Sequence, residues 1–112
     1  MHTIVELPEY KKAVNKLLSD DENKFIIDYL AGNPKSGALI KGTGGVRKLR
    51  WAKDGSGKSG GVRIIYYYHN ETIPLFLLTL FGKNQKENLS NSERNILFKL
   101  TSALVKAYES KK

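Results

Sequence analysis

Residues 42–63 read GTGGVRKLRWAKDGSGKSGGVR, and the rest of the chain is organised around them. The glycines divide this segment into a turn, a short strand over Val46–Ala52, a loop over Gly55–Gly61 and the start of a second strand. Strands joined by such a loop are expected to pair with each other. Glycines beside them let the backbone approach a ligand closely.

The first of these strands alternates between apolar and cationic side chains. Leu49 and Trp51 fall on one face, because neighbouring residues of a strand point in opposite directions. Lys48 and Arg50 then fall on the other face, and Arg63 opens the partner strand. We therefore expect one face to enter the core and the other to present cations to a polyanion.

The charge of the chain is concentrated around this segment. Residues 35–63 carry eight lysines and arginines against one aspartate, whereas the first 34 residues carry four against six acidic residues. The whole chain has a net charge of +8. Such an asymmetric positive field is typical of nucleic-acid binders, and the alternative is a solvated face that only keeps the protein in solution.

Composition limits the possible chemistry. The chain has 112 residues, 40% apolar and 27% charged, as in a globular protein, and a single domain over residues 1–112 is predicted. There is no cysteine, which excludes disulfides and thiolate chemistry. The only histidines are His2 and His69, so neither a metal site nor a cofactor is expected.

No targeting or membrane segment is predicted. The first ten residues, MHTIVELPEY, lack the cationic start and the long apolar run of a secretion signal. The longest apolar run, Ile73–Phe81 apart from Thr79, is far shorter than the roughly 20 residues that span a bilayer. The expected location is the cytoplasm.

Two helices are predicted after a short strand over His2–Leu7. Pro8 suits the first turn of a helix, and Ser19 with Glu22 has the spacing of a capping box that begins the second helix. This second helix ends at Gly32, and the two are expected to form an antiparallel hairpin. Their predicted apolar stripes are Tyr10, Ala13, Val14, Leu17 and Leu18 in the first and Phe25, Ile26, Tyr29 and Leu30 in the second.

The remainder of the chain predicts strands followed by a helix. Pro34–Gly45 is interpreted as a linker, and Val62–His69 is rich in the β-branched and aromatic residues that favour strands. After a tight turn at Asn70–Thr72, Ile73–Phe81 is apolar on both faces, which predicts a central strand covered on both sides. A polar loop over Gly82–Asn88 follows.

The last predicted element is a helix that begins with a second capping box, Ser90 with Glu93. The class is therefore α+β: a mostly antiparallel sheet of about four strands, with an N-terminal helical hairpin and a C-terminal helix. The expected apolar stripe of the last helix consists of Ile96, Leu97, Leu100, Ala103, Leu104, Ala107 and Tyr108.

Several kinds of active site find no support. Neither histidine lies in a nucleophile or metal motif, and the sheet region contains no pair of carboxylates for glycosidase or two-metal chemistry. The glycines match neither GxxxxGK[ST] nor GxGxxG, so a nucleotide-binding loop is not predicted.

What remains is a cluster of cations. Lys48, Arg50 and Arg63 can meet Lys83 and Asn84, which follow the last strand, if the sheet is antiparallel. Such a set can bind phosphate, and tyrosines on the adjoining strand can stack on unpaired bases. It can also cleave RNA, since the 2′-hydroxyl supplies the nucleophile, a cation stabilises the phosphorane, and a desolvated lysine among cations can serve as base. The residues alone leave binding and cleavage both open.

Four blocks of sequence carry a family resemblance: AGNPKSG, GTGGVRKLRWA, GKSGGVRIIYYY and LLTLFGKN, in this order. Together they resemble the RelE/HigB superfamily of toxins from type II toxin–antitoxin systems, in particular the HigB-like branch with a GTGG–R–K–R signature. The resemblance implies a small RelE-like fold and metal-independent endonucleolytic cleavage of mRNA in the ribosomal A site. It also implies a cognate antitoxin, expected to carry a DNA-binding helix-turn-helix.

The resemblance also assigns roles to residues of this chain. One departure is Asn84, which stands where RelE has a second cation, and another is the absence of an aromatic residue from Gln85–Ser92. The general base is therefore left open. The implied catalytic residues are Lys48, Arg50, Arg63 and Lys83. The RNA contacts that we predict beside them are Arg47, Lys53, Lys58, Tyr67 and Asn84.

Two alternatives stand beside the ribonuclease. The first is a ParE-like toxin of the same fold that binds a topoisomerase and cuts no RNA. Its binding role does not require a cluster of cations such as Lys48, Arg50 and Arg63. The second alternative is an RNA-binding module without catalysis, for which loss of Arg63 weakens binding and lowers its salt dependence.

Overall fold

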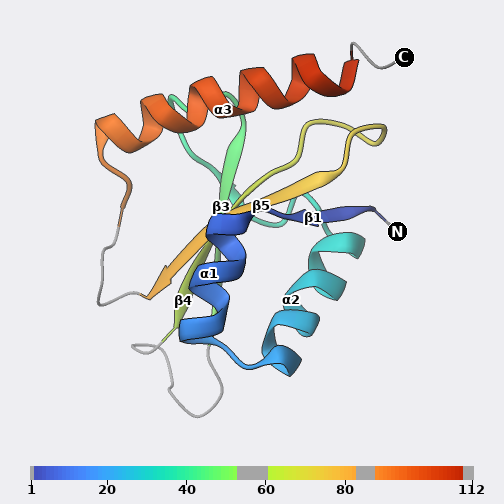
Figure 1. Ribbon diagram of the computed structural model, residues 1–112, viewed down its shortest axis with the longest axis vertical. Coiled ribbons are helices and arrows are strands. Elements are labelled where there is room, and N and C mark those ends of the chain that lie inside the picture. The colour runs from blue at the N-terminus through green and yellow to red at the C-terminus, as the bar shows by residue number, and fades with distance from the viewer. Residues whose placement is uncertain (1, 53–60, 83–87, 110–112) are drawn as a thin grey trace.

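The structure is a computed structural model that describes residues 2–52, 61–82 and 88–109 (Figure 1). Within these ranges the helices and strands follow the order expected from the sequence, with one further short strand, β2 (Ala38–Leu39). The elements are β1 (Ile4–Glu6), α1 (Pro8–Leu17), α2 (Asp20–Gly32), β2 (Ala38–Leu39), β3 (Val46–Trp51), β4 (Val62–Tyr67), β5 (Leu75–Gly82) and α3 (Asn91–Glu109).

The strands form one sheet in the order β1-β5-β4-β3-β2. β1 is parallel to β5, and the other neighbours are antiparallel. The α+β class with a mostly antiparallel sheet is therefore confirmed. The segment Pro34–Gly45 is more than a linker, because Ala38 and Leu39 add a short edge strand to β3.

Helices cover both faces of the sheet (Figure 1). α1 and α2 pack on one face around Tyr10, Ile26 and Leu30, whose side chains are fully buried. α3 lies across the other face, over a second core that contains Ile65 and Phe76. Every residue of β4 is buried, and β5 is buried except for the partly exposed Thr79, so a central strand covered on both sides is confirmed.

β5 contains one irregularity in its pairing with β4. Ile65 lies opposite Thr79, but the next residue, Tyr66, lies opposite Leu77. Leu78 is therefore an extra residue, as in a β-bulge, which bends a strand and redirects its side chains. Beyond the bulge, Leu80 packs in the core on the α1 side and Phe81 in the core on the α3 side.

Both predicted capping boxes are present. Glu22 N donates to Ser19 Oγ at 3.1 Å, and Ser19 N donates to the Glu22 carboxylate at 2.9 Å. Ser90 and Glu93 repeat the same pair of bonds with the same distances, 3.1 and 2.9 Å. These bonds satisfy backbone N–H groups that a helix leaves without partners in its first turn.

The predicted apolar stripes are only partly correct. In α2, Ile26 and Leu30 are buried, but Phe25 remains 65% exposed and Tyr29 41% exposed. The stripe is rotated from the predicted one, because Ile27 and Ala31 pack toward the core in place of Phe25 and Tyr29. In α3 the stripe is rotated, so that Ile96, Ala103 and Ala107 are exposed while Val105 packs on the core.

Alkaline pH is expected to destabilise this fold. Burial, reinforced by Glu6, raises the pKa of Tyr10 far above its ordinary value of 10.0, and burial also raises the pKa values of Tyr66 and Tyr67. Below about pH 10 both the folded and the unfolded chain keep these protons. Above it the unfolded chain loses them first, so the free energy of unfolding falls as the pH rises.

Melting curves by circular dichroism from about pH 8 to about pH 11.5 measure this decline. Tyr10→Phe is expected to make it shallower, while costing about 1 kcal/mol at neutral pH through loss of the 2.8 Å bond from the Tyr10 hydroxyl to Asn23 Oδ1. Tyr29→Phe changes an exposed tyrosine and is the control. A decline equally steep in Tyr10→Phe and wild type contradicts the assignment to Tyr10.

Candidate nucleic-acid interface

The register between β3 and β4 gathers three of the predicted catalytic cations on one face of the sheet. Arg50 lies directly opposite Arg63, and Lys48 lies opposite Ile65. Ile65 belongs to the core beneath α3, so Lys48, Arg50 and Arg63 all point toward the α3 side. We call these three residues the cation cluster.

The members of the cation cluster differ in burial. Arg63 has only 5% of its surface exposed, whereas Arg50 is exposed and Lys48 is intermediate. The cluster therefore extends from inside the protein to its surface. A buried cation is held in a fixed position, and an exposed one can follow a ligand.

Asn88 is a further member of this site that was not predicted from the sequence. Lys48 Nζ donates to Asn88 Oδ1 at 3.0 Å, across forty positions of the chain. This bond joins β3 to the segment that leads into α3. Asn88 lies in the predicted loop Gly82–Asn88, and its polar side chain was the only signal that could have drawn attention to it.

Other predicted site residues lie outside the described residues. Lys83 and Asn84 follow β5, whose last residue, Gly82, is opposite Val62 at the start of β4. Lys53 and Lys58 lie in the chain between β3 and β4. The roles of these four residues stay predictions.

Arg47 lies on the opposite face of β3. Its cross-strand partner is Tyr66, which belongs to the core on the α1 side. Its Nη1 donates to Lys35 O at 3.1 Å and to Gly37 O at 2.8 Å. The structure thus separates Arg47 from the cation cluster and gives it bonds to the segment before β2. A contact of Arg47 with RNA stays a prediction.

Tyr67 lies on the α3 side, but its ring is covered. It has 3% of its surface exposed, and its hydroxyl oxygen lies 3.2 Å from His69 Nδ1. Burial, with a smaller contribution from Glu109, raises the pKa of Tyr67. Stacking of this ring on a base stays a prediction, and it requires that the ring be uncovered first.

The turn before β3 contacts α3 and helps to hold this helix against the sheet. Gly44 has φ +76, and a Cβ there would lie 3.0 Å from Thr101 Oγ1. The buried Thr101 hydroxyl donates to Thr43 O at 3.2 Å. Thr43 Oγ1 in turn accepts from Val46 N at 3.1 Å. The turn at Gly42–Gly45 was predicted to place the strand, and it also holds the helix that covers the same face.

The cation cluster can stabilise negative charge but contains no ordinary acid–base group. The ring of His2 bonds to Ile73 O at 2.8 Å. His69 follows the last residue of β4, whereas Arg63 lies near the first. Across residues 2–52, 61–82 and 88–109, no three His, Cys, Asp or Glu side chains gather as a metal site. The described cluster therefore offers two guanidinium groups and an ammonium group, which are groups that bind anions.

A comparison with protein-family models bears on this arrangement. A model described as "RelE toxin of RelE / RelB toxin-antitoxin system" matches residues 35–112, well over half of the chain. The match begins just before β2 and includes the whole cation cluster. Of the helices that the structure describes, none is both long and apolar enough to cross a membrane.

Proposed function

The chain belongs to the RelE toxin family, and we propose that it is a metal-independent endoribonuclease that cleaves mRNA in the ribosomal A site. Family membership makes it a toxin that works together with a cognate antitoxin. The GTGG–R–K–R signature over residues 42–50 supports placing it in the HigB-like branch. Cleavage of translated messages would inhibit translation and arrest growth.

The observation that carries this proposal is the pairing of Arg50 with Arg63. Directly opposed residues of antiparallel strands have Cβ atoms about 5 Å apart, and like charges at that distance destabilise a sheet. An anion between two such guanidinium groups removes the repulsion and accepts bonds from both. The fold thus keeps two opposed cations whose repulsion a bound phosphate group would relieve.

Cleavage through this site needs only the RNA itself as nucleophile. The 2′-oxygen forms a bond to the adjacent phosphorus, and the bond from phosphorus to the 5′-oxygen of the next nucleotide breaks. A base removes the 2′-hydroxyl proton, and an acid protonates the departing 5′-oxygen. The products are a 2′,3′-cyclic phosphate and a 5′-hydroxyl.

The cluster residues take different parts in this step. Arg63, buried and fixed, stabilises the extra charge of the pentavalent phosphorane. Arg50, which is exposed, binds the phosphate as it arrives. Lys48 is the member that can exchange a proton, since a guanidinium keeps its charge. The cluster has no strong general base, which fits a dependence on the ribosome. A ribosome can orient the RNA and so supply much of the alignment of the reacting groups.

Mapping of mRNA 5′ ends after induction of the protein tests this proposal. We expect new 5′ ends inside translated reading frames and none in messages that lack a start codon. Growth arrest without such ends contradicts it. Inhibition of gyrase supercoiling by the purified protein would then favour the ParE-like toxin, whereas RNA binding with neither activity would favour the binding module.

Asn88→Ala is expected to slow cleavage about two- to tenfold, because Lys48 loses the hydrogen bond that positions its ammonium group. The rate is measured on a reconstituted translation complex. Asn95→Ala, an exposed asparagine within α3, is the matched control. Equal rates for Asn88→Ala and wild type contradict a positioning role for Asn88.

A further inference from the structure

A groove runs along the outer side of β5, beyond the end of β1. β1 pairs with β5 only over Leu75–Leu77, whereas β5 continues to Gly82. Two cavities of about 250 and 280 Å³ open along this stretch. They form one continuous groove, because four residues line both of them. The shared residues are Glu9, Thr79, Leu80 and Phe81.

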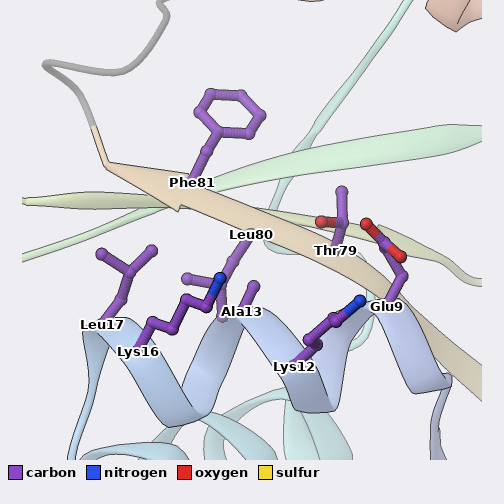
Figure 2. A pocket seen from close by; sticks show the side chains of 8 residues that line it. All are labelled: Glu9, Lys12, Ala13, Lys16, Leu17, Thr79, Leu80 and Phe81. Atoms are coloured by element: carbon purple, nitrogen blue, oxygen red, sulfur yellow. The ribbon is translucent and has the colours of Figure 1, made fainter.

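One wall of the groove is α1. Figure 2 shows Lys12 and Lys16 reaching from this helix toward β5, with Ala13 between them and Leu17 beyond Lys16. Both lysines are exposed. They lie one helical turn apart, so a single bound segment can reach both.

The other wall is formed by the segment before α3 and its first turns. Leu89, Ile96 and Leu97 line this side together with Glu93. Ile96 lies at the rim with 65% of its surface exposed. A large exposed aliphatic side chain beside an apolar groove is typical of a surface on which another protein docks.

The charged residues of the groove favour an acidic occupant. Glu93 is engaged in the cap of α3, since it accepts a bond from Ser90 N at 2.9 Å. Glu9 lies in the first turn of α1, where the helix dipole favours a carboxylate. Lys12 and Lys16 are the groups that a partner can neutralise, and the net charge of +8 adds long-range attraction for an acidic protein.

We propose that this groove holds the toxin-binding segment of the cognate antitoxin. The segment carries apolar side chains for the β5 and α3 side and carboxylates for Lys12 and Lys16. Nucleic acid fits the groove less well, because the apolar side chains along β5 and α3 offer no contacts to phosphate. This inference rests on the proposed toxin function, since it requires an antitoxin.

Calorimetric titration with the cognate antitoxin tests the groove. Ile96→Glu and the double variant Lys12→Glu/Lys16→Glu are each expected to weaken binding roughly tenfold or more. Phe25→Glu is the matched control for Ile96→Glu, because Phe25 has the same exposed fraction of 65% on α2. Lys11→Glu, on α1 but outside the groove lining, is the control for the lysines.

Three results overturn the proposal: wild-type affinity in both groove variants, an equal loss in the control variants, or no binding by the wild-type chain. Loss of ribosome binding with unchanged antitoxin binding assigns the groove to the ribosome and also overturns it. Cleavage of mRNA by the wild-type chain is measured separately. If the groove variants bind the antitoxin more weakly but the wild-type chain cleaves no mRNA, the groove is supported and the nuclease is contradicted. If the variants bind normally and the wild-type chain cleaves mRNA, only the groove is contradicted.

Discussion

Replacing Arg63 with alanine is expected to slow mRNA cleavage about 100- to 1,000-fold and to abolish growth arrest. Arg63 has only 5% of its surface exposed and lies opposite Arg50 before any substrate arrives. A donor fixed in this way needs no reorganisation when charge develops on the phosphorane. The rate of cleavage of a message on purified ribosomes measures the effect, beside growth after induction.

The fold is expected to survive this substitution. Arg63→Ala removes a like-charged neighbour of Arg50, which offsets part of the packing that is lost. A melting temperature close to that of the wild type confirms that only the site has changed. Arg63→Lys keeps the charge but loses the planar fork, so we expect it to restore only a small part of the activity.

Arg50→Ala is the companion variant. If Arg50 and Arg63 act on one phosphate, the double variant loses less activity than the two single losses combined. Independent, multiplicative losses contradict a shared phosphate. Growth arrest that persists in a folded Arg63→Ala protein removes Arg63 from the catalytic set.

The strands that carry this site could be predicted from the sequence. Val46–Trp51 alternates, Val62–Tyr67 is rich in β-branched and aromatic residues, and Leu75–Gly82 is apolar on both faces. Glycines marked the limits of these strands, and the capping boxes marked the beginnings of α2 and α3. The α+β class follows from these local signals because each agrees with its neighbours.

The register of the sheet could not be predicted. That Arg50 faces Arg63 depends on which residues of β3 and β4 pair, and a long connection does not determine this, as a two-residue hairpin turn does. β2 was missed because two exposed residues, Ala38 and Leu39, show no alternation. Its pairing with β3 is a tertiary effect.

The orientation of side chains also depended on tertiary packing. Tyr67 was expected to be available to RNA, but α3 covers the face on which its ring lies. Arg47 precedes Lys48 in the chain and therefore points to the other face of β3, where carbonyl groups of the segment before β2 accept its hydrogen bonds. Strand alternation alone predicts that Arg47 lies on the other face from Lys48 and Arg50. The carbonyl groups that accept its hydrogen bonds could be identified only from the structure.

Replacing Tyr66 with phenylalanine is expected to lower the free energy of unfolding by about 2–4 kcal/mol, a large loss for removal of one oxygen atom. The Tyr66 hydroxyl accepts from Gly37 N at 2.8 Å and donates to Pro34 O at 2.9 Å. Gly37 is buried, so its N–H loses its partner without gaining water. Urea unfolding measures the loss. The matched control is Tyr68→Phe, two residues further along the chain and packed against the same core.

The loss of stability in Tyr66→Phe is also expected to affect the cation cluster. The segment that Tyr66 holds leads directly into β2, and β2 pairs with β3 at Arg47 and Lys48. Loosening it removes support from the strand that positions Lys48, so Tyr66→Phe is expected to weaken growth arrest most at temperatures near its own lowered melting point. Gly37→Ala provides an independent approach, because its Cβ would lie 2.8 Å from Tyr66 Cε1 and displace the ring. Equal stability of Tyr66→Phe and Tyr68→Phe would show that these two bonds contribute nothing beyond the packing of the ring.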